Sequence, residues 1–272
     1  MSSATLYIVA TPIGNLQDVS QRVLATLAQV GVIAAEDTRN TRKLLTHFDI
    51  HKKVVAYHNF NEKTAAEPLL AYLRAGQDVA LVSDAGYPLI SDPGYILVQR
   101  VIAEGFKLTV VAGPNAALAA LVASGLKTAH YLFYGFLNAK ASMAKKELAA
   151  LKDFPYTMIF YEAPHRIKKT LDLCLEVLGD REACIARELT KLHEEYVRGS
   201  LSKLAAIEEY RGELVLVIAG QTAEPASIAA ADLLEKVEEL VAAGLRVKEA
   251  CGQLGQEYGV SKKELYDLYV KK

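Results

Sequence analysis

Short runs of apolar and β-branched residues alternate with amphipathic stretches along most of this chain. Two of the runs, 79–82 and 214–218, are continuously apolar, as is typical of strands covered by helices on both faces. The pattern predicts ten strands: Thr5–Ala10, Val32–Glu36, Val54–Tyr57, Val79–Asp84, Leu108–Ala112, Tyr131–Gly135, Thr157–Glu162, Ala183–Glu188, Glu195–Arg198 and Leu214–Ala219. Strands that alternate with helices in this way predict an α/β fold with mostly parallel sheets.

The alternation changes along the chain and suggests three parts. It is regular up to about residue 115, whereas after residue 125 the predicted strands lie closer together near 183–198, which favours a second, mixed sheet. We therefore expect an α/β domain at 1–124, a second α/β domain at 125–224, and a helical tail at 225–272.

The tail pattern predicts helices at 231–243 and 247–257, and then a last helix opened by the capping box Ser261-Lys262-Lys263-Glu264. Two helices joined by a short glycine-containing turn also describe a helix-turn-helix. However, residues 227–272 carry seven basic and eight acidic side chains, so a small appendage that packs or dimerises is the simpler interpretation.

Composition narrows the class of protein. The 272 residues are 51% hydrophobic and 23% charged, which indicates a folded globular protein, and no apolar run reaches the ~18 to 20 residues that span a bilayer. The first residues carry no basic segment, so a secretory signal is not expected. Three cysteines without a C-x-x-C pair argue against a disulfide framework and favour a reducing cytoplasm. A net charge of −1 gives no global attraction to nucleic acid.

Three prolines follow predicted strands, at Asp92-Pro93, Gly113-Pro114 and Ala163-Pro164. Proline suits the first position of a helix, and Asp92 suits the N-cap of the first of these helices. The sequence thus predicts helix N-termini at the carboxyl ends of strands, where open α/β sheets bind ligands.

The segment 83–94, Ser-Asp-Ala-Gly-Tyr-Pro-Leu-Ile-Ser-Asp-Pro-Gly, is the most informative loop. Its small residues let a ligand approach the backbone closely, although an ordinary βα connection with an Asx turn has the same pattern. The dinucleotide, P-loop and nucleophile-elbow glycine motifs are missing. Only His47 and His51 have ligand-like spacing, and no metal site is expected there.

Several segments resemble the tetrapyrrole methylase superfamily: 6–16, 35–39, 83–94 and 112–116. Together with 160–166 and 186–191 they are similar to one branch of it, the bacterial small-subunit ribosomal RNA methyltransferases. This resemblance implies two α/β domains, a homodimer, and S-adenosyl-L-methionine bound in the cleft between the domains. It also implies the reaction, which is transfer of a methyl group to the ribose 2′-oxygen of a decoding-centre cytidine in 16S rRNA of the small ribosomal subunit.

The same resemblance implies the cofactor site. By position, the residues that would contact S-adenosylmethionine are Pro12, Ser83, Asp84, Ala85, Gly86, Tyr87, Asn115, Ala116 and Tyr161. These positions agree with the residue pattern, because they are predicted strand ends or helix starts.

Local charge offers a surface for RNA. Residues 39–53 hold five basic side chains against one acidic, and 138–169 hold seven against three, with aromatic residues interleaved in the second segment. Clustered cations can track phosphates while aromatics stack an unpaired base, although two solvated helix faces would have the same composition. The RNA-binding candidates are Arg42, Lys43, Lys140, Lys145, Lys146 and Arg166. One departure from the family is Asn138-Ala139-Lys140, where relatives carry a more basic stretch.

Catalysis by such an enzyme requires positioning of the 2′-hydroxyl and removal of its proton, without a metal. Carboxylates at predicted strand ends include Glu36 and Glu162, and our preferred hypothesis for the base is Glu188 or Asp37. Cations nearby would orient phosphates or stabilise a developing alkoxide: Arg39, Arg187 and Lys191. The alternative is that these charges form a salt-bridge network between the domains.

Two other functions stay open at the level of the sequence. A relative that methylates a tetrapyrrole or a protein side chain would need a deep apolar cleft and no basic patches. A non-catalytic dimer that binds RNA or a nucleotide would leave no methylated product.

Overall fold

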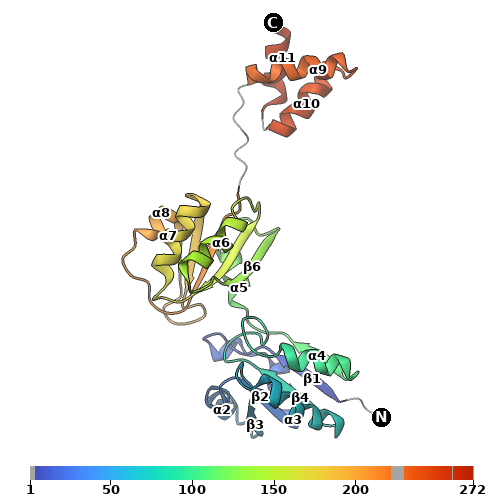
Figure 1. Cartoon of the computed structure of the whole chain (residues 1–272), viewed down its shortest axis with the longest axis vertical. Coiled ribbons are helices and arrows are strands. Elements are labelled where there is room, and N and C mark those ends of the chain that lie inside the picture. The colour runs from blue at the N-terminus through green and yellow to red at the C-terminus, as the bar shows by residue number, and fades with distance from the viewer. Residues whose placement is uncertain (1–3, 222–229, 259, 272) are drawn as a thin grey trace. The chain divides into compact units, whose positions relative to one another are not determined.

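The protein is described here by a computed structural model that covers residues 4–221, 230–258 and 260–271 (Figure 1). The chain divides into two compact units, 1–220 and 221–272. The first unit contains two five-stranded sheets, and the second is helical in its described residues.

The first sheet is entirely parallel, with the order β3-β2-β4-β1-β5. Its strands are β1 (Thr5–Val9), β2 (Val32–Ala35), β3 (Val54–Ala56), β4 (Val79–Val82) and β5 (Lys107–Val111). The segments between them form η1 (Leu16–Asp18), α1 (Gln21–Gln29), α2 (Thr38–His47), α3 (Glu62–Arg74) and α4 (Tyr95–Ala103). Separate buried clusters cover the two faces: Val79 and Leu81 belong to one, Ala80 and Val82 to the other. Burial on both faces explains why β4 is apolar at every position.

The second sheet is mixed, with the order β6-β7-β10-β8-β9, in which only β6 and β7 are parallel. Its strands are β6 (Tyr131–Phe136), β7 (Thr157–Glu162), β8 (Glu182–Arg187), β9 (Glu195–Ser200) and β10 (Leu214–Ile218). The accompanying helices are α5 (Ala116–Ser124), α6 (Ala141–Ala150), α7 (Ile167–Leu178) and α8 (Leu201–Ala205). Helix α5 packs through Ala117, Ala120 and Leu121 on one face, whereas α6, α7 and α8 cover the other. Thus α5 precedes the boundary expected at residue 124 but packs against the second sheet.

The ten predicted strands are confirmed, each with ends within two residues of the expected ones. The prediction for the three prolines was wrong in detail, because each helix begins two or three residues later. Gly94 is the N-cap of α4, Asn115 that of α5 and Arg166 that of α7.

Asp92 is therefore not the N-cap of α4, as the sequence suggested. The Gly94 backbone N–H donates instead to Glu62 of α3, at 2.6 Å. Gly94 has φ of 144°, and a Cβ there would lie 2.9 Å from Leu81 and Leu89 side-chain atoms, so glycine is required at this close approach.

The second unit contains η2 (Ala230–Leu233), α9 (Leu234–Ala242), α10 (Val247–Tyr258) and α11 (Lys262–Lys271). These helices share a core that includes Leu233, Val237, Leu254 and Leu265. The predicted capping serine is present, since Ser261 Oγ accepts the Glu264 backbone N–H at 3.4 Å. Among the described helices of both units, none is long and apolar enough to cross a membrane.

Candidate functional site

A cavity of about 430 Å³ lies in the first unit, where segments from both sheets meet. The first sheet contributes the loop after β4, and the second contributes the end of β7, the start of β10 and the N-terminus of α5. Because β7 and β10 are antiparallel, Glu162 pairs with Leu214, so one strand end and one strand start reach the same edge. The cavity is lined by Ile13, Asp84, Ala85, Gly86, Tyr87, Ile90, Ser91, Asp92, Asn115, Ala116, Phe136, Tyr161, Glu162, Ala163, Pro164, Leu189, Glu213, Leu214 and Val215.

The loop after β4 is held in place by the ends of two neighbouring strands. Thr11 and Gly86 exchange backbone hydrogen bonds of 2.8 and 3.1 Å, and the Thr11 hydroxyl donates to the Ser83 carbonyl at 3.1 Å. Farther along the loop, the Tyr87 hydroxyl accepts the Gly113 N–H at 3.1 Å. The loop is therefore positioned by β1 and by the segment after β5.

The same loop stores backbone strain. Leu89 and Ser91 adopt the left-handed region with φ of 71° and 67°. Glu188 and Thr190, which flank the cavity residue Leu189, adopt it as well. Non-glycine residues in this region cost free energy and persist only where the surrounding contacts fix them, and such residues cluster at ligand sites.

The N-terminus of α5 supplies backbone donors to the cavity. The Asn115 side chain accepts the Leu118 N–H at 2.9 Å and so caps the helix. Burial raises the pKa of Tyr161, and the Ala117 backbone N–H at the start of this helix opposes the rise. Exposed N–H groups at a helix start attract anions, because the helix dipole is positive there.

Asp84 links the loop to α2. Its carboxylate accepts the Asp37 backbone N–H at 3.1 Å and the Asn40 side-chain amide at 3.0 Å. Next to it, a smaller cavity of about 190 Å³ lies against α2 and is lined by Thr11, Pro12, Leu16, Asn40, Thr41, Lys43, Leu44, Ser83 and Asp84.

Two further carboxylates lie close to Asp84, one at the end of β2 and one in the loop. Burial, and then the neighbouring charge of Asp84, raise the pKa of Glu36. Burial, and then the charge of Glu36, raise the pKa of Asp92 to about 6, although a hydrogen bond with the Ser83 side chain opposes the rise. This edge of the first sheet therefore concentrates negative charge.

Asp37 has the opposite environment. Its carboxylate accepts three hydrogen bonds from the Arg39 guanidinium, at 2.6, 3.0 and 3.2 Å, and the Arg39 backbone N–H at 2.8 Å. These bonds lower the pKa of Asp37 to about 2. The Arg39 side chain is 82% exposed, so the pair lies at the surface at the start of α2.

Glu188 and Lys191 form a second charged group. Glu188 accepts the Glu213 backbone N–H at 2.9 Å, and Lys191 Nζ lies 3.0 Å from both the Glu188 and Glu213 carboxylates. The Glu213 N–H first, and then Lys191, lower the pKa of Glu188. Nearby, Arg187 pairs with Glu195 at 2.5 Å.

Glu162 lines the cavity but is 3% exposed. It accepts the Thr170 hydroxyl at 2.5 Å and the Ala163 N–H at 2.8 Å, and Arg166 lies 3.3 Å away. Arg166 also donates to the Leu137 carbonyl at 2.8 Å. Both side chains thus hold the start of α7 against the second sheet.

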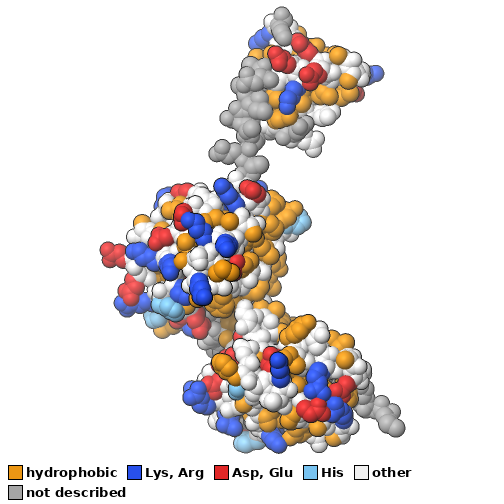
Figure 2. All heavy atoms as spheres, in the orientation of Figure 1, with side chains coloured by type: hydrophobic (Ala, Val, Ile, Leu, Met, Phe, Trp, Pro, Cys, Tyr) orange, Lys and Arg blue, Asp and Glu red, His pale blue; other side chains and the backbone are white. Residues whose placement is uncertain are grey.

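The basic candidates lie on two helices. Arg42 and Lys43 are exposed on α2, where Arg39, Arg42, Lys43, Thr46 and His47 line a shallow hollow of about 520 Å³. Lys140, Lys145 and Lys146 are exposed at the start of α6, with Lys145 paired to Glu176 at 2.5 Å. Figure 2 shows cationic and acidic side chains intermixed over the region of α6 and α7.

The fold gathers most of the sequence candidates for the cofactor. Seven of the nine line the larger cavity, and Pro12 and Ser83 line the smaller one beside it. Of the candidate catalytic residues, Glu162 lines the larger cavity, whereas Asp37, Arg39, Arg187, Glu188 and Lys191 do not. The sequence pattern did not mark Asp92, Phe136 or Glu213–Val215 as site residues. Asp92 lies in the loop 83–94, which the sequence pattern singled out, but it was interpreted there as a helix N-cap and not as a residue of the site.

Comparisons with known proteins agree with this architecture. The family model for tetrapyrrole (corrin/porphyrin) methylases matches residues 5–205. Among solved structures, the methyltransferase CobJ is similar with a TM-score of 0.60 and 19% identity, covering 80% of this chain and 95% of its own. A diphthine synthase is similar with a TM-score of 0.62 and 14% identity, covering 81% and 91%. At these identities, the likeness shows the fold alone.

Relatives with much higher identity bear one name, ribosomal RNA small subunit methyltransferase I. The protein from Halalkalibacterium halodurans is 46% identical over 97% of this chain and 94% of its own length. Those from Bacillus subtilis and Synechocystis are 43% and 44% identical, each over 97% of this chain and 93% and 96% of their own. This chain therefore belongs to the tetrapyrrole methylase family and, within it, to the family of ribosomal RNA small subunit methyltransferases I.

Proposed function

We propose that this protein transfers a methyl group from S-adenosylmethionine to the ribose 2′-oxygen of a decoding-centre cytidine in 16S rRNA of the small ribosomal subunit. The observation that carries the proposal is the 430 Å³ cavity, in which the strand ends of both sheets meet the N-terminus of α5 in a chain of this family. A small-subunit substrate implies the cytoplasm as the place of action.

The residues of the cavity fit the methyl donor. S-adenosylmethionine has a carboxylate, which suits the N–H groups at the start of α5, and an ammonium and ribose hydroxyls, which suit the Asp84 carboxylate. Ile90, Leu189 and Val215 provide an apolar wall against which an adenine ring can pack. When bound, the donor supplies a methyl group on a positively charged sulfur, which an oxygen nucleophile displaces.

The RNA would approach across the exposed cations. Arg42 and Lys43 on α2 lie next to the smaller cavity, whereas Lys140 is the N-cap of α6 and Lys146 lies within that helix. Exposed lysines and arginines of this kind hold phosphates without reading sequence. Arg166 is held by Glu162 and Leu137, so within this proposal it acts first as a support for α7.

The assignment of the base to Glu188 or Asp37 stays a prediction, as do the roles of Glu162, Arg39, Arg187 and Lys191. The ion pairs of these residues favour the alternative, a salt-bridge network. Asp37 pairs with Arg39, Glu188 with Lys191, and Arg187 with Glu195. A carboxylate whose pKa is held low by a cation is a weak proton acceptor.

We also propose that the protein acts as a homodimer. Exposed apolar side chains follow the edge strand β6 and the outer side of α5, and Figure 2 shows hydrophobic side chains gathered along this edge. They are Leu118 and Val122 on α5, Tyr131 and Phe136 on β6, and Tyr156 just before the neighbouring strand β7. Contiguous exposed apolar surface is typical of protein interfaces.

The testing experiment is transfer of a labelled methyl group from S-adenosylmethionine to small ribosomal subunits isolated from cells that lack this modification. Mass spectrometry of the digested nucleosides should detect 2′-O-methylcytidine. Subunits from cells in which this modification is complete provide the matched control, because they have no free acceptor site. Tight donor binding with label only in protein or in a tetrapyrrole would contradict the proposal.

A further inference from the structure

We propose that the smaller cavity beside the donor site holds the pyrimidine ring of the acceptor nucleotide, and that Asn40 reads this ring as cytosine. The inference rests on the proposed function and deepens it, because it assigns the residue that selects the acceptor base. It starts from the two cavities and the cationic hollow that meet along α2.

The smaller cavity lies between the donor cavity and the hollow on α2. Asp84 lines both cavities, and Lys43 lines both the smaller cavity and the hollow. A nucleotide with its base in the smaller cavity therefore has its ribose near the donor and its phosphate near Lys43 and the arginines of the hollow. Contacts to phosphate position a nucleotide, whereas contacts to the base select it.

The smaller cavity suits one flat heteroaromatic ring. Its volume of about 190 Å³ leaves no room for the four rings of a tetrapyrrole. Pro12, Leu16 and Leu44 provide apolar surface for the faces of a ring, and Asn40 and Thr41 provide polar groups for its edge. Enzymes that act on a nucleotide turned out of its stack hold the base in this way, between apolar side chains and with hydrogen bonds to its edge.

Thr41 brings an unpaired hydroxyl to this cavity. The residue is only 4% exposed, and within residues 4–221 its hydroxyl has no hydrogen-bond partner. A nearly buried hydroxyl of this kind bonds to whatever fills the cavity beside it, either water or a ligand. The ring carbonyl of a pyrimidine can accept this hydrogen bond.

Asp84 fixes the direction in which the Asn40 amide faces. One oxygen of the Asp84 carboxylate accepts the Asp37 backbone N–H at 3.1 Å, and the other accepts the Asn40 amide at 3.0 Å. A carboxylate can only accept, so the NH₂ group of Asn40 faces Asp84 and its carbonyl oxygen faces away. Asn40 thereby offers a ligand one acceptor and one donor, the second hydrogen of its amide, and neither has a partner within residues 4–221.

This pair of groups matches cytosine and not uracil. The Watson–Crick edge of cytosine carries an amino donor beside a ring-nitrogen acceptor, whereas that of uracil carries a carbonyl acceptor beside a ring N–H donor. Uracil would require the Asn40 amide to be reversed, and the amide oxygen would then face the Asp84 carboxylate in place of a hydrogen bond. Asn40 is selective because Asp84 holds it in one orientation.

The first test compares full-length wild type, Asn40→Ala and the control Asn59→Ala, which changes an exposed asparagine between β3 and α3. The substrates are small subunits assembled in vitro with cytidine or uridine at the acceptor position. We expect wild type to prefer cytidine at least about 10-fold in kcat/KM. Asn40→Ala should lower kcat/KM for cytidine about 10-fold and bring the two substrates within about 3-fold of each other. Asn59→Ala should match wild type on both.

The Kd for S-adenosylmethionine separates reading of the base from support of Asp84. If Asn40 only held Asp84 in place, Asn40→Ala would raise this Kd and leave the ratio of cytidine to uridine unchanged. We expect the opposite, with a Kd within about 3-fold of wild type and a lost preference.

Thr41→Val tests the second polar group of the cavity. Valine keeps the shape of threonine and removes only the hydroxyl, which has no partner in the described protein. The Tm should therefore not fall, whereas kcat/KM on cytidine subunits should fall about 5-fold, which is the loss of one hydrogen bond. A lower Tm at unchanged kcat/KM would instead assign Thr41 a structural role.

A binding measurement locates the base without any reaction. NMR of protein with ¹³C-labelled leucine methyls, titrated with cytidine 5′-monophosphate, should shift the signals of Leu16 and Leu44, which line the cavity, and not that of Leu192. Uridine 5′-monophosphate should shift them less at the same concentration.

Three results overturn the inference. They are a preference for cytidine that survives in Asn40→Ala, wild-type kcat/KM on cytidine subunits in both cavity variants, or leucine signals that do not respond to cytidine 5′-monophosphate. A wild-type protein that makes no 2′-O-methylcytidine on cytidine subunits refutes the proposed function instead. In that case the mononucleotide titration still decides whether the cavity binds a pyrimidine.

Discussion

Carboxylates that occupy similar places in the sequence have very different surroundings in the fold. Asp37 and Glu162 each follow or end an apolar strand, and both were candidates for catalysis. Asp37 is at the surface with Arg39, whereas Glu162 is buried with Thr170 and Arg166 as partners. Carboxylates at similar places in the sequence therefore have different roles, because their burial and their nearest hydrogen-bond donors differ.

Glu162→Ala should lower the stability of the first unit by about 3 kcal/mol. The change leaves the Thr170 hydroxyl without its acceptor and the Arg166 guanidinium without its buried partner. Thermal unfolding followed by circular dichroism measures the effect as a lower Tm. The control is Glu176→Ala, which removes only an exposed pair with Lys145 and should cost less than about 1 kcal/mol. Equal losses for the two variants would contradict a structural role for Glu162.

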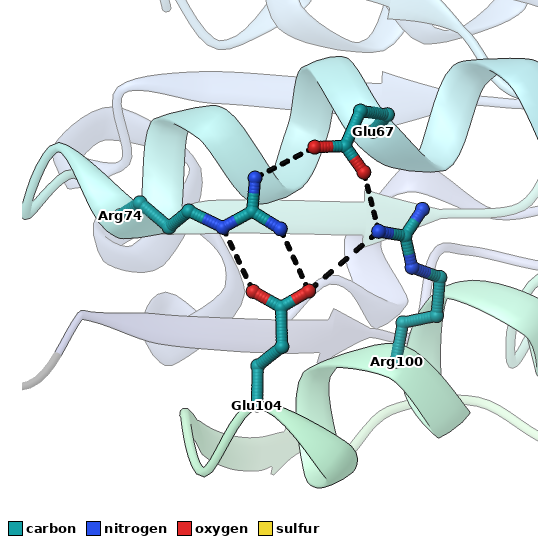
Figure 3. A network of polar contacts seen from close by, with 4 residues as sticks. All are labelled: Glu67, Arg74, Arg100 and Glu104. Carbon is teal, nitrogen blue, oxygen red and sulfur yellow. Dashed lines mark hydrogen bonds and ion pairs between the residues drawn. The ribbon is translucent and has the colours of Figure 1, made fainter.

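At the scale of elements, α3 and α4 are neighbours on one face of the first sheet and are joined by a ring of charges. Figure 3 shows Glu67 and Arg74 on α3 with Arg100 and Glu104 near the end of α4. Arg74 makes two hydrogen bonds of 2.8 Å to Glu104 and one of 2.6 Å to Glu67, and Arg100 also bonds to Glu67. Apolar residues beneath, such as Leu70 and Leu97, hold the two helices together as well.

Glu67→Gln should lower the Tm slightly, by roughly 2 °C, and only at neutral pH. Hydrogen bonds from Arg74 and then Arg100 lower the pKa of Glu67 from its ordinary value of 4.5. A lowered pKa contributes stability that is present above pH 4.5 and is lost as the pH falls through the folded-state value. Scanning calorimetry from pH 7 to pH 3 should therefore show the difference between wild type and variant vanish on acidification.

The ionic strength provides an independent check on this network. Because its side chains are partly exposed, 0.5 M salt should reduce the difference at pH 7. A difference that survives both acid and salt would show that Glu67 acts through packing instead of charge.

At the scale of the whole molecule, the first unit depends on contacts between its two sheets. Gly14, after β1, lies so close to the turn after β8 that a Cβ would be 2.7 Å from Lys191 and 3.0 Å from the Leu189 carbonyl. These contacts between the segment after β1 and the turn after β8 close one side of the cavity. On the outside of the same unit, β6 and α5 expose apolar side chains.

The homodimer predicts that Val122→Glu yields a monomer. Val122 is 73% exposed on α5, and a charge there would be desolvated at an interface. Light scattering coupled to size-exclusion chromatography should give twice the chain mass for wild type and the chain mass for the variant. Leu192→Glu, which changes a strongly exposed leucine between β8 and the opposite edge strand β9, should stay dimeric. A wild-type monomer would refute the dimer, and an unchanged mass for Val122→Glu would exclude this edge as its interface.

The sequence by itself determined the elements and the order in which they occur. The ten strands were predictable because burial on two faces leaves a local, continuous apolar signal, as in 79–82 and 214–218. The loop at 83–94 could be singled out as a candidate ligand loop because its small residues are adjacent in the chain, and residues 84–87 and 90–92 of it line the cavity. Four of the seven cofactor candidates that line the cavity belong to this loop, whereas Asn115, Ala116 and Tyr161 reach the cavity from other segments.

Only the tertiary structure decided which partner each side chain has. No local pattern indicated that Glu62 would accept the N–H at the start of α4 in place of Asp92, since 32 residues separate Glu62 from Gly94. Similarly, α5 packs on the second sheet, although it follows the first in the chain. Beside burial, the charges that raise the pKa of Asp92 belong to Glu36 and Asp84, which the parallel strands β2 and β4 bring to one sheet edge. Proton affinity depends on such long-range neighbours, and local periodicity contains no information about them.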